Sequence, residues 1–197
     1  MVSIGPFACL PTRIIEAILT PESKIKGNGR IEGLPGMEHL KGVLSESLYS
    51  ALCAREICHE VDPSLAEEAL LGTMLRRLGH ILVSFYLPEE EQAIRRELAG
   101  GGQLTPHQAE IQVLGTSYEH IGRIVAKEWN FPLTIRHCMQ PLDAPPAGPA
   151  NAPETRLQLL ANLADEATGI LRGGKSDEAK LKLKNIIDDY SSALNID

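Results

Sequence analysis

Apolar residues recur every three to four positions along most of this 197-residue chain, which is the spacing of amphipathic helices. Alternating apolar and polar runs bounded by hairpin turns, the pattern of strands, are missing. The sequence therefore predicts an all-α fold. The expected helices lie at residues 12–19, 37–60, 63–79, 88–99, 106–114, 118–129, 133–139, 154–171 and 177–194.

Residues that start or stop helices set these bounds. Asp62-Pro63 and Thr105-Pro106 each place a capping side chain before a proline suited to the first helical turn. Pro88 opens a helix whose acidic start, Glu89 to Glu91, suits the positive end of the helix dipole. The glycine-rich segment 27–36 and the Pro- and Ala-rich segment 141–153 are expected to be irregular.

The apolar positions also predict which side chains are buried. The run from Ile81 to Tyr86 is expected to be buried, and Trp129 is expected to pack in the core against Pro132 rather than serve as a stacking platform. The predicted buried faces of two further helices are Leu40, Leu44, Leu48, Ala51 and Cys58, and Ile121, Ile124, Val125 and Trp129.

Composition narrows the class of protein. A chain of 197 residues with 43% hydrophobic residues is suited to one helical domain. Its net charge of −7 argues against a nucleic-acid partner. No run is apolar enough for a membrane helix, and the N-terminus does not resemble a signal peptide, so a cytoplasmic protein is expected. The four cysteines, at irregular spacing, are expected to be reduced thiols.

The segment 70–87, LLGTMLRRLGHILVSFYL, resembles the metal-binding helix of an HD-type phosphohydrolase. In that family the corresponding helix carries an adjacent His-Asp pair that helps to bind the catalytic metal. Here the pair is Arg76-Arg77. A guanidinium is always protonated and offers only hydrogen-bond donors, so it cannot ligate a cation.

Residues 45–169 as a whole resemble the second lobe of an HDOD domain, a bacterial signalling relative of the HD hydrolases. Four segments carry the resemblance: ESLYSALCAREI, EEALLGTMLRRLGHILVSFYLPEE, EIQVLGTSYEHIGRIVAKEWNFPLTIRHCMQP and LLANLADEATG. The resemblance implies a multi-helix bundle of the HD/HDOD type at residues 37–172. Residues 1–36 would be a helix and connector left from the first lobe, and residues 173–197 a C-terminal helix.

The resemblance also implies a degenerate site. Glu46 stands where HD enzymes have a histidine, His80 where a lysine often follows the His-Asp pair, and Tyr118 where relatives often have another histidine. Gln140-Pro141 replaces a His-His pair. Only Asp165 matches a metal-ligand position, so no catalytic residue, metal or cofactor is expected.

The candidate residues for a vestigial pocket, or for ligand or partner binding, are Glu46, Arg76, Arg77, His80, Tyr118 and Asp165. We expect Arg76 to form a buried ion pair with Glu46 or Asp165, with Arg77 at the surface, because an unpaired buried guanidinium is costly. In the alternative interpretation, Arg76, Arg77 and His80 bind an anion such as a nucleotide phosphate.

Three functions follow from these alternatives. The favoured one is a non-catalytic signalling or regulatory module that contacts a protein partner such as a sensor, kinase or receiver domain, and that could form homo-oligomers. The second is a nucleotide-sensing domain without catalysis. The third is a divergent metal-dependent phosphohydrolase with a site rebuilt from Glu46, His80, His120, His137 and Asp165.

Overall fold

The computed structural model describes residues 36–101, 104–142, 144–174 and 176–196. Within these ranges the regular structure is helical and no strand occurs, so the predicted all-α fold is confirmed. The expected helix at 12–19 and nearly all of the connector at 27–36 lie outside the described residues. In the part of the chain that is described, no helix combines the length and apolar character needed to cross a membrane.

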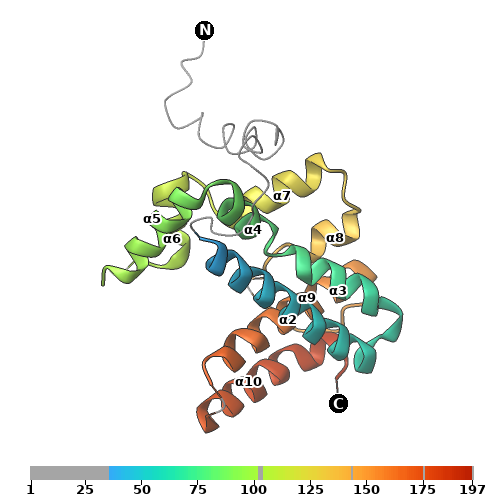
Figure 1. Cartoon of the computed structure of the whole chain (residues 1–197). Coiled ribbons are helices and arrows are strands. Elements are labelled where there is room, and N and C mark those ends of the chain that lie inside the picture. Colours follow the sequence, from blue (N-terminus) through green and yellow to red (C-terminus); the bar gives the residue numbers. More distant parts are fainter. Residues whose placement is uncertain (1–35, 102–103, 143, 175, 197) are drawn as a thin grey trace. The chain divides into compact units, whose positions relative to one another are not determined.

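The helices follow the predicted order (Figure 1). They are α2 (Met37–Val61), the short 3-10 helix η3 (Pro63–Leu65), α3 (Ala66–Leu75), α4 (Leu78–Tyr86), α5 (Pro88–Ala99), α6 (Pro106–Leu114), α7 (Tyr118–Glu128), α8 (Leu133–Cys138), α9 (Pro153–Arg172) and α10 (Asp177–Leu194). Most predicted bounds are confirmed to within one residue. The predicted helix at 63–79 was wrong: it is divided into η3, α3 and the start of α4, with a break at Arg76-Arg77.

Local capping explains why the sequence located α6 so well. The Thr105 hydroxyl accepts from Gln108 N at 3.3 Å, and Gln108 Oε1 accepts from Thr105 N at 2.9 Å, which completes a capping box. At the other end Gly115 adopts φ 71°, a left-handed conformation that glycine reaches without steric cost.

Asp62 does not cap a helix with its side chain as predicted. Its carboxylate instead accepts hydrogen bonds from Ser64 Oγ at 2.7 Å and from Arg156 Nε at 3.2 Å. Pro63 starts η3, and α3 begins three residues later at Ala66. The carboxylate therefore ties the α2–α3 connection to α9.

Several predicted core side chains are exposed, namely Leu44, Leu48, Phe85 and Trp129. On α2 the error has a geometric cause. Steps of four residues drift around a helix of 3.6 residues per turn, so a row with that spacing leaves the buried face. Apart from the adjacent Ser50 and Ala51, the side chains that α2 buries follow mixed steps of three and four: Leu40, Val43, Ser47, Ser50, Ala51, Ala54 and Cys58.

The chain divides into two compact units. Unit 1 comprises Met1–Leu44 and Leu78–Val125, of which residues 1–35 and 102–103 are not described, and unit 2 comprises Ser45–Arg77 and Ala126–Asp197. Helix α2 contributes residues to both units.

Unit 1 is built around α4, α5 and α6, with α4 packed on α5 and α5 on α6. Its buried side chains include Leu82, Val83, Ile94, Leu114 and Ile121. Gly79 allows α4 to approach the start of α7 closely: a Cβ at this position would lie 1.8 Å from the Tyr118 carbonyl oxygen. The glycine of the Leu78-Gly79 step is therefore required for the packing of this unit.

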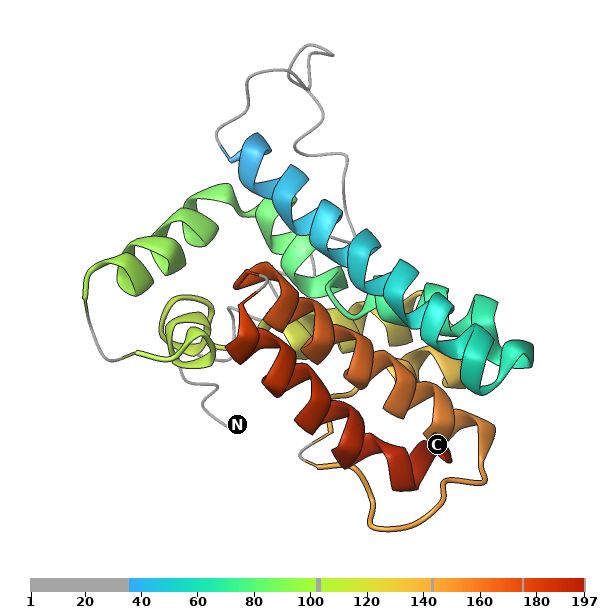
Figure 2. The ribbon, with the colours of Figure 1, turned by 90° about the horizontal axis from the view of Figure 1, so that it is seen from below.

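Unit 2 is centred on α9, which packs against α3, α8 and α10. Figure 2 shows α9 and α10 side by side over much of their length. The buried face of α9 supplies Leu157, Leu160 and Leu163, and α10 covers it with Tyr190 and Leu194. The C-terminal helix is thus an integral part of this core.

The cysteine thiols of unit 2 give a test of this core. Cys58 and Cys138 are fully buried, and burial is the main reason why the pKa of each thiol is raised to about 11. At pH 8 a thiol with that pKa is ionised roughly 100-fold less than an ordinary one, and the thiolate is the reactive form. We expect iodoacetamide to alkylate both at least tenfold more slowly than the half-buried Cys53.

Peptide-resolved mass spectrometry of the native protein measures these rates, and the same labelling in denaturant provides the control. Rates for Cys58 or Cys138 equal to that of Cys53 in the native protein would contradict the packing. Burial also raises the pKa of Cys53, so the comparison tests the relative burial of the three thiols.

Candidate functional site

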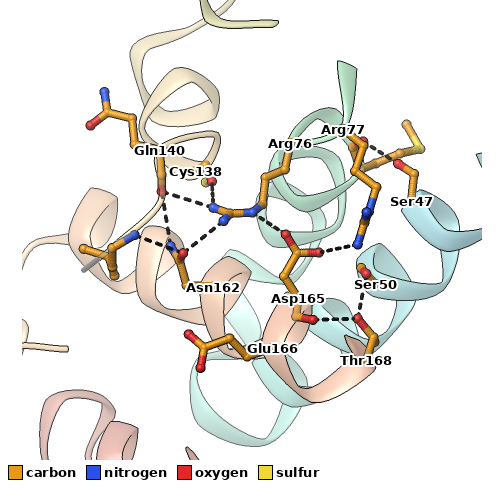
Figure 3. Close-up of polar contacts among 12 residues, drawn as sticks. Ser47, Ser50, Arg76, Arg77, Cys138, Gln140, Asn162, Asp165, Glu166 and Thr168 are labelled. Atoms are coloured by element: carbon orange, nitrogen blue, oxygen red, sulfur yellow. Dashed lines mark hydrogen bonds and ion pairs between the residues drawn. The ribbon is translucent and has the colours of Figure 1, made fainter. Parts of the chain in front are cut away.

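Arg76 occupies the junction between α3 and α4, where the HD enzymes have the first residue of their metal-binding pair. Its side chain is 11% exposed and makes four hydrogen bonds (Figure 3). Nε donates to Asp165 Oδ2 at 2.7 Å, and Nη2 donates to Asn162 Oδ1 at 2.9 Å. Nη1 donates to two backbone carbonyls, those of Cys138 at 2.6 Å and Gln140 at 3.1 Å. The guanidinium is therefore nearly saturated by partners from unit 2 itself.

Asn162, on α9, completes this network. Its Nδ2 donates to the carbonyls of Gln158 at 2.7 Å and Gln140 at 3.2 Å. Its Oδ1 accepts from Arg76 and also from Leu142 N at 3.2 Å. The amide therefore connects α9, the chain after α8 and Arg76, and each of its groups has a partner.

Arg77, predicted at the surface, is half-buried and also contacts this network. Nη1 lies 3.5 Å from Glu46 Oε2, and Nη2 lies 3.7 Å from Asp165 Oδ1. Glu46 has a second partner, because its Oε1 is 2.6 Å from Arg172 Nη2. Three guanidinium groups thus face two carboxylates, which leaves one net positive charge.

A row of hydroxyl groups accompanies these charges (Figure 3). The hydroxyl oxygens of Ser50 and Thr168 lie 2.8 Å apart, and Thr168 donates to the Asp165 carbonyl at 3.0 Å. Ser47 donates to the Met74 carbonyl at 2.5 Å. These contacts align α2 with α3 and α9 within unit 2 and position Asp165. These contacts were not predicted, because serine on a helix gives no clear sign of burial.

The candidate residues fall into two groups. Glu46, Arg76, Arg77 and Asp165 meet in unit 2, and of the two predicted partners for Arg76 the structure selects Asp165. His80 and Tyr118 belong to unit 1, where their partners are different.

In unit 1 the rings of His80 and Tyr118 stack with centroids 4.4 Å apart and an interplanar angle of 9°. The Tyr118 hydroxyl donates a hydrogen bond to Glu91 Oε2. The other carboxylate oxygen, Oε1, lies 2.7 Å from His39 Nε2 and 3.4 Å from His80 Nε2. Helices α4, α7 and α2 therefore bring His80, Tyr118 and His39 to the buried carboxylate of Glu91.

Glu91 is only 3% exposed. Burial alone would raise the pKa of this carboxyl, but hydrogen bonds from His80 and Tyr118 and the charges of both histidines hold the pKa below its usual range. Burial, with the adjacent Glu91 charge, raises the pKa of Tyr118 far above its ordinary value. Glu91 is therefore an anion and Tyr118 a neutral donor.

The contact between His39 and Glu91 is an ion pair only if His39 is protonated. Burial lowers the pKa of His39, Glu91 opposes this effect, and Arg95 and His80 add to it. At neutral pH His39 is accordingly a neutral ring that donates a hydrogen bond.

His39 and Glu91 were not predicted from the sequence as site residues. Glu91, like Glu89 and Glu90, was interpreted only as part of an acidic helix start favoured by the helix dipole. One signal was available: Glu91 lies three residues before Ile94, on the side of α5 that is buried. A carboxylate at an apolar position of a helix needs a buried partner.

Among the described residues, one group of three or more His, Cys, Asp or Glu side chains converges closely enough to bind a metal: His39, His80 and Glu91. The alternative hydrolase site predicted from the sequence shares only His80 with this group. His120 and His137 are exposed, and Asp165 is engaged by Arg76. Among the described residues, this group does not include Glu46, His120, His137 or Asp165.

Comparisons with known proteins agree with this fold. The HDOD domain family model matches residues 24–145, more than half of the chain. An HDOD domain protein with unknown function from Geobacter sulfurreducens superposes with a TM-score of 0.63 at 18% identity, covering 96% of this chain and 60% of its own. A putative phosphohydrolase from Shewanella amazonensis SB2B gives a TM-score of 0.60 at 16% identity, covering 95% of this chain and 76% of its own.

The chain thus spans about three fifths of the length of the first of these structures. A search of the curated proteins found no match. The family match covers both Arg76-Arg77 and the His39, His80 and Glu91 group, and the predicted resemblance is confirmed. This chain belongs to the HDOD domain family.

Proposed function

We propose that this protein is a non-catalytic signal-transduction module that acts by binding a protein partner such as a sensor, kinase or receiver domain. The observation that carries the proposal is the environment of Arg76. Its guanidinium stands at the position of the lost His-Asp pair and is held by Asp165, Asn162 and two backbone carbonyls.

Electrostatics support the absence of hydrolysis. Arg76, Arg77 and Arg172 bring three fixed positive charges to Glu46 and Asp165. A divalent cation placed there would be repelled by the guanidinium groups and would have to break the Arg76–Asp165 hydrogen bond to gain a ligand. Without a metal, this site cannot activate water as HD enzymes do.

An exposed apolar face on α2 supports a role in protein contact. Within unit 2, Leu48 is 50% exposed, and Tyr49 and Leu52 are also exposed. Leu48 and Leu52 are four residues apart, so their side chains neighbour one another on the helix. Aromatic and leucine side chains presented on a helix are suited to packing in the groove of another protein.

A site-specific cross-link tests this role. We expect a photoreactive amino acid at position 49 to give a discrete cross-linked product in the source organism, with a protein that carries a sensor, kinase or receiver domain. Leu48→Glu with Leu52→Glu should reduce the product at least tenfold. The matched control is Leu181→Glu on α10, which changes a leucine that is 60% exposed and should leave the product unchanged.

Turnover of a phosphomonoester or phosphodiester by the full chain with Mg²⁺ or Mn²⁺, lost in Asp165→Asn, would overturn the proposal. Equal cross-linking by the Leu48 and Leu52 double variant and the wild type would remove the α2 face from it.

One observation favours nucleotide sensing as a second candidate. Arg77 Nε is buried and has no hydrogen-bond partner among the described residues, and the surrounding charges sum to plus one. Anion binding at Arg77 would raise the melting temperature in the presence of cyclic dinucleotides or guanosine polyphosphates. Arg77→Met should abolish that rise, and the absence of a shift with every nucleotide would exclude this function.

A further inference from the structure

We propose that His39 Nε2, His80 Nε2 and Glu91 Oε1 bind a divalent transition-metal cation of the zinc class within unit 1. These atoms come from the start of α2, from α4 and from α5, and all lie within 4.8 Å of one another. The two imidazole nitrogens are 3.3 Å apart, and their distances to the carboxylate oxygen are 2.7 Å for His39 and 3.4 Å for His80. This site is separate from the Arg76 network and goes beyond the proposed function.

The spacing fits one small cation. Zinc binds nitrogen and oxygen at about 2.0–2.1 Å, so neighbouring ligand atoms of a tetrahedral site lie roughly 3.3 Å apart. The His39–His80 and His80–Glu91 distances, 3.3 and 3.4 Å, already match that edge. The His39–Glu91 contact at 2.7 Å would have to open by roughly 0.6 Å.

When no cation is bound, the three atoms must share the N–H groups of the two imidazoles. A neutral imidazole carries one N–H, and the carboxylate of Glu91 only accepts. If both histidines donate to Glu91, two N–H groups face one another across 3.3 Å. If only one donates, the other nitrogen turns a lone pair toward the carboxylate. A cation would use all three lone pairs at once.

The surroundings fix the ligands in place. Tyr118 holds the second oxygen of Glu91 through its hydroxyl, and its ring stacks on His80 and so fixes the orientation of the imidazole. Partners of this kind orient metal ligands and strengthen binding. Two imidazoles and one carboxylate favour zinc, copper, nickel or cobalt over magnesium and calcium, which prefer oxygen alone.

Two further charged groups face the site. Arg95 Nε lies 3.7 Å from Glu91 Oε1 and opposes a cation, but its side chain is 41% exposed, so the guanidinium can turn into solvent. Glu110 Oε2 accepts from Tyr118 N at 2.9 Å, which places another carboxylate nearby. Removing the Arg95 charge should therefore tighten binding.

Calorimetry with Zn²⁺ on the tag-free, EDTA-treated full chain tests the proposal. We expect one Zn²⁺ per chain, and His39→Gln and His80→Gln should each weaken binding at least tenfold. Tyr118→Phe keeps the stacked ring but loses the hydroxyl, and should weaken binding severalfold to tenfold. Arg95→Met should strengthen it. His120→Gln and His137→Gln, which change exposed histidines, are matched controls.

Co²⁺ substitution supplies a second measurement, because tetrahedral Co²⁺ absorbs visible light much more strongly than the hydrated ion. We expect that absorption in the wild type and its loss in His39→Gln, with circular dichroism confirming that the variant is folded. No binding to the wild type, or equal binding by the His39 and His120 variants, would overturn the proposal. Phosphoester turnover is measured separately, so the proposed function can fail while this site stands.

Discussion

Gly79→Ala is expected to unfold unit 1 or to destabilise it by about 3 kcal/mol or more, the upper end of the usual cost of overpacking. The added Cβ would lie 1.8 Å from the Tyr118 carbonyl oxygen, 2.7 Å from the Tyr118 carbonyl carbon and 2.8 Å from Gly122 N. All three are backbone atoms, so no side chain can rotate to relieve the clash. Urea unfolding followed by circular dichroism measures the loss.

Two other helical glycines serve as controls. A Cβ at Gly42 in α2 or at Gly169 in α9 would meet no atom within 4 Å. Alanine at either position should stabilise the protein by about 0.5–1 kcal/mol, because alanine loses less conformational entropy in a helix. A Gly79→Ala protein with the same unfolding midpoint as the wild type would show that α4 and α7 do not approach as described.

Asp165→Ala should cost about 3 kcal/mol, the second large effect expected from this fold. Removing the carboxylate leaves the largely buried guanidinium of Arg76 without its charged partner. An unpaired charge destabilises a protein far more when it is buried than when it is exposed to water. The small exposure of both side chains keeps the expected loss at the lower end of the range for buried pairs. Urea denaturation measures it directly.

A double-mutant cycle separates the pair from its surroundings. The double variant Arg76→Met with Asp165→Leu should lose less stability than the two single variants added together. Each single variant leaves one charged group of the pair without its partner, whereas the double variant removes both charges. The exposed pair Glu119 and Arg123 provides the matched comparison: Glu119→Ala should change stability by less than about 0.5 kcal/mol. Additive losses for Arg76 and Asp165 would contradict the direct contact.

The helices were predictable because their ends depend on local chemistry. Thr105 with Gln108 acts within one turn of the chain, as does Pro88, and the structure places a helix start beside each. Burial depends on what packs against each helix. The sequence could therefore not show that Trp129 and Phe85 would be exposed, or that the Arg76-Arg77 step would interrupt a helix.

The site was predictable only in part. The resemblance to HD enzymes correctly predicted that Arg76 and Asp165 lie together, because it assigns both positions to one site. The same argument grouped His80 and Tyr118 with them, whereas their partners are His39 and Glu91. Those two were missed because their importance arises from tertiary contacts between segments up to 52 residues apart along the chain.

The contacts of Arg76 have a practical consequence for anyone who expresses part of this protein. The family match ends at residue 145, but Asp165 and Asn162 lie beyond it on α9. A fragment trimmed at that boundary would leave the Arg76 guanidinium without its carboxylate and amide, and would strip α9 and α10 from the apolar core. Such a fragment should aggregate when produced, so truncation studies should retain the chain through Leu194.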